Sequence, residues 1–64
     1  MIEYRVSRAG RQYLGCTPDD VFVALYGLVD DDEVMAASVW AEHASIGETY
    51  HGSDYIVEVV DDEN

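Results

Sequence analysis

The chain has 64 residues and a formal net charge of −11, from fourteen Asp and Glu against three Arg and no Lys. All three arginines, Arg5, Arg8 and Arg11, lie within the first eleven positions. This length allows one domain, residues 1–64. The charge excludes a surface that holds nucleic acid directly through Lys and Arg.

The composition is that of a folded domain rather than an acidic disordered tail. Hydrophobic residues make up 48% of the chain and aromatic residues 11%, whereas disordered chains are poor in both. The single cysteine, Cys16, excludes an intrachain disulfide and favours a reducing compartment. No run approaches the roughly twenty apolar residues of a membrane span. We expect a cytoplasmic protein without membrane contacts.

The first elements in chain order form a predicted hairpin. Residues Ile2 to Ser7 alternate between apolar and polar side chains, which predicts a half-buried strand. Ala9 to Arg11 can turn the chain, and Gln12 to Leu14 can return as a short second strand.

A helix is predicted next, from Pro18 to about Leu28. Thr17 suits the N-cap, Pro18 suits the first helical position, and Asp19 and Asp20 favour the positive helix N-terminus. The segment is apolar nearly all round, so we expect burial on more than one side, by the domain or by a partner subunit. A homodimer would add buried area to so small a core.

A second helix follows an acidic run. Asp30 with Glu33 resembles a capping box. Val34, Ala37, Ala41 and Ala44 then fall on one helix side, and Gly47 would end the helix. Residues 37–43 also fit a strand, which would change the topology.

The chain ends with a predicted turn, strand and tail. Gly52 to Asp54 form the turn, and Tyr55 to Val60 form a strand with apolar residues on both faces, which indicates a covered, central position. Residues 61–64 form an acidic tail that should fray. The expected fold class is α+β, with a small antiparallel sheet (N-terminal hairpin plus C-terminal strand) and two helices packed on one face.

The uncompensated carboxylates are the main indication of function. Thirteen follow Gln12 with no Lys or Arg among them. A domain of this length spans about 28 Å, and an equal length of duplex DNA carries roughly sixteen phosphates. A groove built to hold DNA could therefore accept this surface instead. The candidate partner-binding residues are Asp19, Asp20, Asp30, Asp31, Asp32, Glu33, Glu42, Glu48 and Asp54.

Other interpretations of the polar residues lead to no catalytic, metal or cofactor site. The acidic run from Asp30 to Glu33 could associate with divalent cations, but it lacks the glycine and glutamate spacing of an EF-hand. Cys16, His43 and His51 are too few and too far apart for structural zinc. We expect Cys16 to be a small packing residue and the arginines to pair with nearby carboxylates.

As a whole, the chain resembles small, acidic, phage-encoded anti-CRISPR proteins that inhibit type I complexes, with the type I-C system as one such target. The resemblance covers the full length and rests on size, an α+β pattern, and carboxylates such as Asp19, Asp20 and Asp30 to Glu33. Members that mimic DNA occupy the cationic DNA-binding surface of the effector complex. The resemblance therefore implies stoichiometric inhibition without catalysis, in the cytoplasm of an infected host cell.

The predicted function is a non-enzymatic inhibitor that mimics DNA charge and blocks a host DNA-binding protein, with a type I CRISPR effector subunit as the partner that the resemblance implies. The alternative is a small acidic structural or interaction module, dimeric or salt-adapted, without mimicry. Its carboxylates would be spread evenly around an apolar contact patch.

Overall fold

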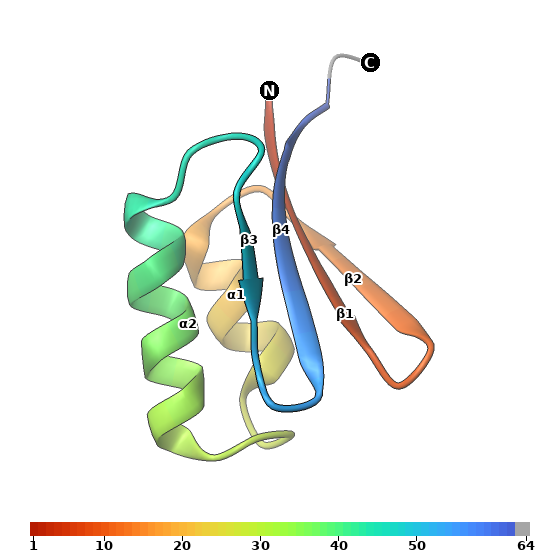
Figure 1. The fold of residues 1–64 in the computed structure, drawn as a ribbon, viewed down its shortest axis with the longest axis vertical. Helices are drawn as coiled ribbons and strands as arrows, with labels where there is room; N and C mark the ends of the chain where they lie inside the picture. Colours follow the sequence, from red (N-terminus) through yellow and green to blue (C-terminus); the bar gives the residue numbers. More distant parts are fainter. Residues whose placement is uncertain (63–64) are drawn as a thin grey trace.

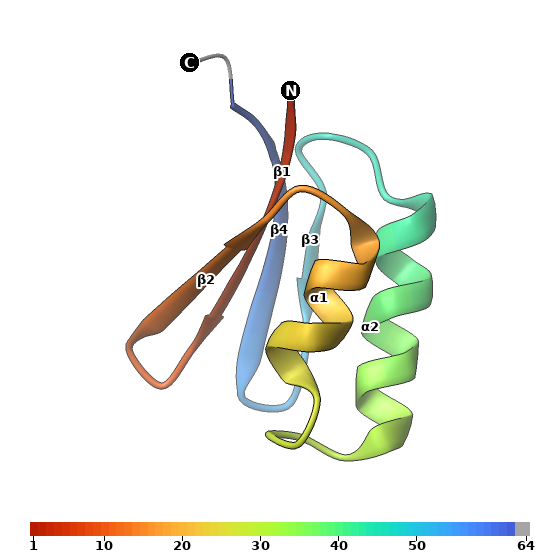
Figure 2. The same ribbon diagram turned by 180° about the vertical axis from the view of Figure 1, so that it is seen from behind.

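The computed structural model describes residues 1–62, which form a four-stranded antiparallel sheet with two helices on one face (Figure 1). The strand order is β2-β1-β4-β3. Seen from behind, both helices lie on the same side of the sheet, and the β1–β2 hairpin extends away from them (Figure 2). This arrangement confirms the expected α+β fold.

The N-terminal hairpin consists of β1 (Ile2–Arg8) and β2 (Arg11–Gly15). The two loop residues both have positive φ angles, 51° at Ala9 and 78° at Gly10. Two such residues in sequence match the twist of paired strands and make a tight hairpin loop. Each strand is one or two residues longer than predicted.

The C-terminal strand β4 (Tyr55–Asp61) is central, as predicted, because it pairs with both β1 and β3. The edge strand β3 (Thr49–His51) was not predicted. Three residues are too few to display an alternating pattern, and the strand is defined by its pairing with residues 56–58.

Both helices exist, but each is shorter than expected. The helix α1 (Pro18–Leu25) starts at the predicted residue and ends before Gly27, which has a φ of 82°. The helix α2 (Asp31–His43) ends at His43, because the backbone of the next residue, Ala44, is extended, and the helix does not reach Gly47. Residues 37–43 are therefore helical and not a strand.

The predicted capping box at α2 is wrong. Asp30 occupies the N-cap position but makes no side-chain cap hydrogen bond. The Glu33 carboxylate instead accepts hydrogen bonds from the backbone N–H of Ser53 at 3.3 Å and from its hydroxyl at 3.1 Å. Glu33 thus ties the first turn of α2 to the β3–β4 turn.

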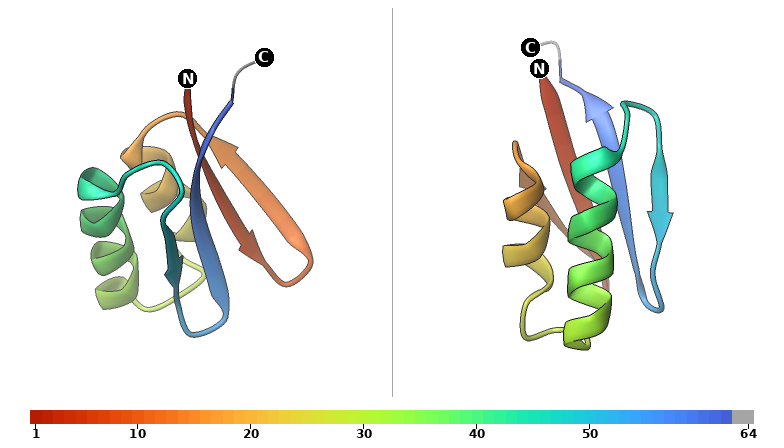
Figure 3. Two further views of the ribbon diagram at one scale, coloured as in Figure 1. Left: turned by 45° about the horizontal axis from the view of Figure 1, so that its top comes forward. Right: turned by 90° about the vertical axis from the view of Figure 1, so that its left-hand side faces the viewer.

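The core lies between the sheet and the helices, as the two layers in Figure 3 indicate. Of the described residues 1–62, ten are buried there: Tyr4, Val6, Val21, Leu25, Val34, Ala37, Ala41, Tyr55, Val57 and Val59. Burial, with further contributions from Tyr50 and Glu33, raises the pKa of Tyr55 to about 12. The Tyr55 ring is 6.2 Å from that of Tyr50, which lies 5.4 Å from Trp40.

Within residues 1–62, no helix lies on the opposite face of the sheet, so the expected cover on both faces of β4 is wrong. Ile56 is 38% exposed there. The prediction was based on the apolar residues of β4 alone. On this face their neighbours on the adjacent strands are polar, since Ile56 lies opposite Ser7 and His51.

The predicted fraying of the acidic tail is also wrong for its first half. Asp61 belongs to β4 and its carboxylate accepts a hydrogen bond from the N-terminal ammonium at 2.9 Å. The backbone N–H of Asp62 donates to the carbonyl of Met1 at 2.7 Å. Residues 63–64 lie outside the described part of the chain. Within residues 1–62, neither helix has the length and apolar content to cross a membrane.

Candidate partner-binding surface

Five of the nine candidate carboxylates lie together where α2 begins. Asp30, Asp31, Asp32 and Glu33 surround the first turn of α2, and Asp54 lies in the β3–β4 turn that Glu33 contacts through Ser53. Figure 1 places the α2 start and this turn at the same end of the molecule. We call these five residues the α2-start group.

The other four candidates lie at the opposite end. Asp19 and Asp20 are in the first turn of α1, Glu42 is near the end of α2, and Glu48 is in the loop that follows. They share one end because α1 and α2 run in opposite directions (Figure 1). We call these four residues the α1-start group.

Asp20 in this group has a defined local role. Its Oδ2 accepts hydrogen bonds from the backbone N–H of Cys16 at 2.8 Å, the backbone N–H of Thr17 at 3.1 Å and the Thr17 hydroxyl at 3.2 Å. The bond from Cys16, followed by that from Thr17, lowers the pKa of Asp20. Asp20 is thus an anion held in place by the α1 start.

The structure therefore divides the nine candidates into two groups rather than one face. Asp32 and Glu42 are ten residues apart on α2, which corresponds to about 15 Å along the helix axis. Eight of the nine are exposed, and Glu33 is half-buried. The division follows from the antiparallel helices, which no local pattern in the sequence specifies.

Few cations neutralise these groups. Ion pairs within residues 1–62 join Arg5 to Glu3 at 2.6 Å, Arg8 to Asp54 at 3.1 Å, and the N-terminus to Asp61 at 2.9 Å. Two arginines thus pair with carboxylates as expected, and Glu3 raises the pKa of Arg5. Of the nine candidates, only Asp54 has an ion pair within this part of the chain.

An apolar groove between the helices was missed by the sequence reasoning. It has a volume of about 240 Å³ and is lined by Phe22, Tyr26, Asp31, Val34 and Met35. Tyr26 is 65% exposed and Met35 is 55% exposed. Within α1, Val21 and Leu25 are buried but Val23 is 71% exposed, so residues 1–62 leave one side of this helix uncovered. Burial of that side by a partner subunit stays a prediction. The length of the chain could have indicated this exposure, because a domain of this size has too little chain to cover a helix on every side.

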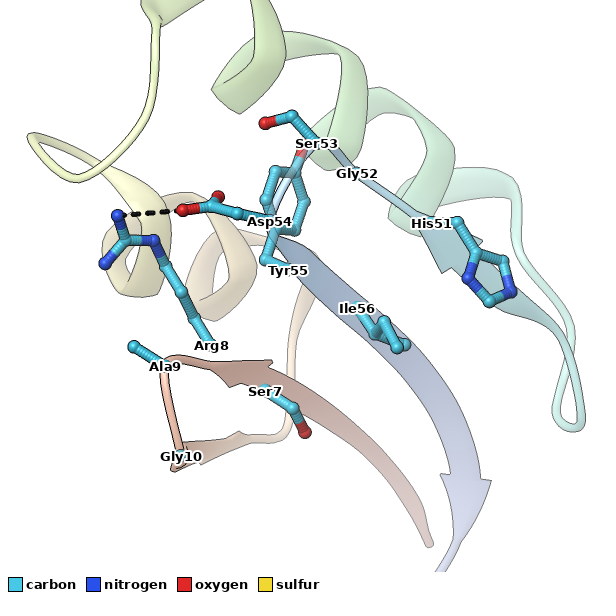
Figure 4. A pocket seen from close by; sticks show the side chains of 10 residues that line it. All are labelled: Ser7, Arg8, Ala9, Gly10, His51, Gly52, Ser53, Asp54, Tyr55 and Ile56. Carbon is cyan, nitrogen blue, oxygen red and sulfur yellow. Dashed lines mark ion pairs between the residues drawn. The ribbon is translucent and has the colours of Figure 1, made fainter.

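A second hollow lies between the β1–β2 and β3–β4 turns, with a volume of about 400 Å³ (Figure 4). At its edge, Nη2 of Arg8 contacts Asp54 and also donates to the carbonyl of Leu28 at 3.4 Å. Arg8 thereby links β1, the α1–α2 loop and the β3–β4 turn. We assign it a structural role.

The cysteine and the two histidines, which could ligate zinc, lie in different parts of the fold. Cys16 is exposed, so the expectation that it is a small packing residue is wrong. His43 ends α2 and His51 lies in β3. Across residues 1–62, no three His, Cys, Asp or Glu side chains are grouped so that they could hold a metal ion.

Comparisons with protein-family models, curated proteins and solved structures gave no match to this chain.

Proposed function

We propose that this protein is a non-enzymatic inhibitor that imitates the charge of DNA and blocks the nucleic-acid-binding surface of a host defence complex. The observation that carries the proposal is the pair of acidic groups at opposite ends of the molecule, in which eight of nine carboxylates have no ion pair within residues 1–62. Such groups project a field of one sign toward an approaching partner.

The charge density supports this proposal. The molecule is 32 Å long, and the same length of duplex DNA carries about nineteen phosphates. Twelve carboxylates follow Gln12 within the described residues, so the two densities agree within about a factor of two. Arg and Lys side chains on a partner would meet carboxylates instead of phosphates, and binding would be fast and sensitive to salt.

The proposed target is a DNA-binding subunit of a type I CRISPR effector complex, with the type I-C complex as the first to test. This choice rests on the resemblance of the chain to small acidic anti-CRISPR proteins. The mechanism needs no chemical step: the inhibitor occupies the cationic site in a stoichiometric complex and excludes DNA by sterics and charge.

A pair of matched variants tests the acidic groups. Asp31→Asn with Asp32→Asn removes two charges from the α2-start group and spares Glu33, whose carboxylate holds Ser53. Glu58→Gln with Asp61→Asn removes two charges from the sheet. We expect the first variant to inhibit DNA binding by the purified effector complex about tenfold less well, mainly through slower association. The second should inhibit like the wild type, and equal inhibition by both variants would reject the proposed surface.

The apolar groove favours a second candidate function, an acidic interaction module without mimicry. Protein interfaces commonly have an apolar centre and a polar rim, and Tyr26 and Met35 lie in such a centre. Tyr26→Gln with Met35→Gln would abolish binding to a partner of this kind. The binding would also persist at high salt, whereas binding through charge mimicry would not.

A further inference from the structure

The free edge of β2 is poorly protected. This strand pairs with β1 on one side and is the first strand in the sheet order. Residues 11–14 are all exposed, with Leu14 at 62% and Tyr13 at 38%. Edge strands are usually blunted by lysine, proline, a bulge or short length, and β2 has no such feature beyond Arg11. The opposite edge, β3, has only three residues.

The hairpin geometry shows which backbone groups face outward. Across a two-residue loop, the flanking pair, here Arg8 and Arg11, exchanges backbone hydrogen bonds. Paired residues in an antiparallel ladder alternate between bonded and non-bonded pairs. Gln12 and Leu14 therefore direct their N–H and C=O groups away from β1, toward the free edge.

The charge distribution favours a second copy of this chain as the occupant of that edge. Residues 4–18 contain no carboxylate and include all three arginines. The β1–β2 hairpin is thus the region where two strongly acidic molecules can approach with least repulsion. It also extends away from the helices, which leaves the edge accessible (Figure 2).

We propose that β2 pairs antiparallel with β2 of a second copy, about a two-fold axis at Tyr13. In this register Gln12 of each copy lies opposite Leu14 of the other, so all four outward-facing N–H groups and all four C=O groups of these residues are paired. Registers centred on Gln12 or Leu14 would place some of them opposite Gly10 in the loop or Cys16 beyond the strand. The product is a continuous eight-stranded sheet.

The same register supplies a charge pair. Arg11, which has no ion pair within residues 1–62, comes to lie opposite Gly15 of the second copy. Gly15 has no side chain, and a Cβ there would meet Asp20, so Asp20 covers this position. Arg11 and Gly15 both point to the helical side of the sheet, because Tyr13 between them pairs with the buried Val6. The Arg11 guanidinium of each copy can therefore reach the Asp20 carboxylate of the other copy. The two-fold axis generates two such contacts.

Sedimentation of the full chain tests the association. Because only Gln12 and Leu14 of each copy form backbone hydrogen bonds across it, the interface is small, and we expect twice the 7.1 kDa chain mass only at about 0.1–1 mM. Gln12→Pro removes an outward N–H without breaking the β1–β2 ladder and should weaken association at least about tenfold. The matched control is His51→Pro, which removes an outward N–H from the β3 edge and should dimerise like the wild type. Circular dichroism should show that both variants are folded.

Disulfide cross-linking tests the register, also in the full chain. With Cys16→Ser as the background, Tyr13→Cys places two thiols at the two-fold axis, at a separation that suits a disulfide. Leu14→Cys places the two thiols on diagonal neighbours across the paired strands, about 7–8 Å apart, which is too far for a disulfide. We expect rapid covalent dimerisation of the first variant only. A monomeric wild type up to about 1 mM, dimers that survive Gln12→Pro, or equal cross-linking at both positions would overturn the proposal.

Discussion

Neighbouring residues Asp19 and Asp20 differ in role although both are exposed carboxylates in the first turn of α1. Asp20 accepts hydrogen bonds from the backbone N–H groups of Cys16 and Thr17, and no side-chain hydrogen bond of Asp19 is found within residues 1–62. A sequence can indicate that an aspartate at this position favours the helix N-terminus. It cannot indicate which of two adjacent aspartates turns back toward the chain.

The pair offers a charge-matched test of stability. We expect Asp20→Asn to lower the melting temperature by a few degrees, because a neutral amide oxygen is a weaker acceptor than a carboxylate. Asp19→Asn changes the net charge equally and should leave the melting temperature nearly unchanged. Differential scanning fluorimetry at neutral pH measures both. Similar effects of the two substitutions would contradict the role assigned to Asp20.

The lowered pKa of Asp20 predicts how the contribution of this residue to stability changes with pH. Its pKa is lowered on folding from a usual value of 3.8, so the unfolded chain binds the proton at higher pH than the folded chain does. The stability that Asp20 contributes is complete above pH 3.8 and is lost as pH falls through the folded-state pKa. The stability difference between wild type and Asp20→Asn should therefore shrink over that acidic range.

At the scale of elements, the sequence indicated where structure begins better than where it ends. Thr17 and Pro18 mark the start of α1 by local chemistry, and that prediction is confirmed. The strand β3 depends on tertiary contacts, such as the pairing of Tyr50 with Val57, and so was missed. The end of α1 was predicted three residues too late, although Gly27, with a φ of 82°, follows it closely in the sequence. The exposed side of α1 was also missed, although the small size of the domain indicated that the chain cannot cover a helix on every side.

The β3–β4 hairpin provides a prediction at this scale. The Tyr55 ring occupies the space where a Cβ on Gly52 would lie, and the Gly52 N–H donates to the Tyr55 carbonyl at 2.9 Å. Gly52→Ala should destabilise the fold by about 1–3 kcal/mol through overpacking. Chemical denaturation measures this cost, with Thr49→Ala in the exposed part of β3 as a control. In the Tyr55→Leu background the cost of Gly52→Ala should fall, and strict additivity would contradict the steric explanation.

At the scale of the whole molecule, the number of uncompensated carboxylates could be predicted from the sequence, but their arrangement could not. Composition alone gives the net charge of −11. The antiparallel helices then place Asp31 and Asp32 at one end and Asp19 and Glu42 at the other, with an apolar groove between the helices. Under the proposed mimicry, the partner would offer cationic sites at two separated positions, as a groove that holds successive phosphates of a duplex does.

The most direct measurement is competition between this protein and duplex DNA for a partner captured from host lysate or for a purified type I effector complex. If the acidic groups stand in for phosphates, DNA should displace the protein in a concentration-dependent manner, and the affinity should fall steeply as salt rises. A partner that binds DNA and this protein at the same time, with little dependence on salt, would contradict the proposed mimicry.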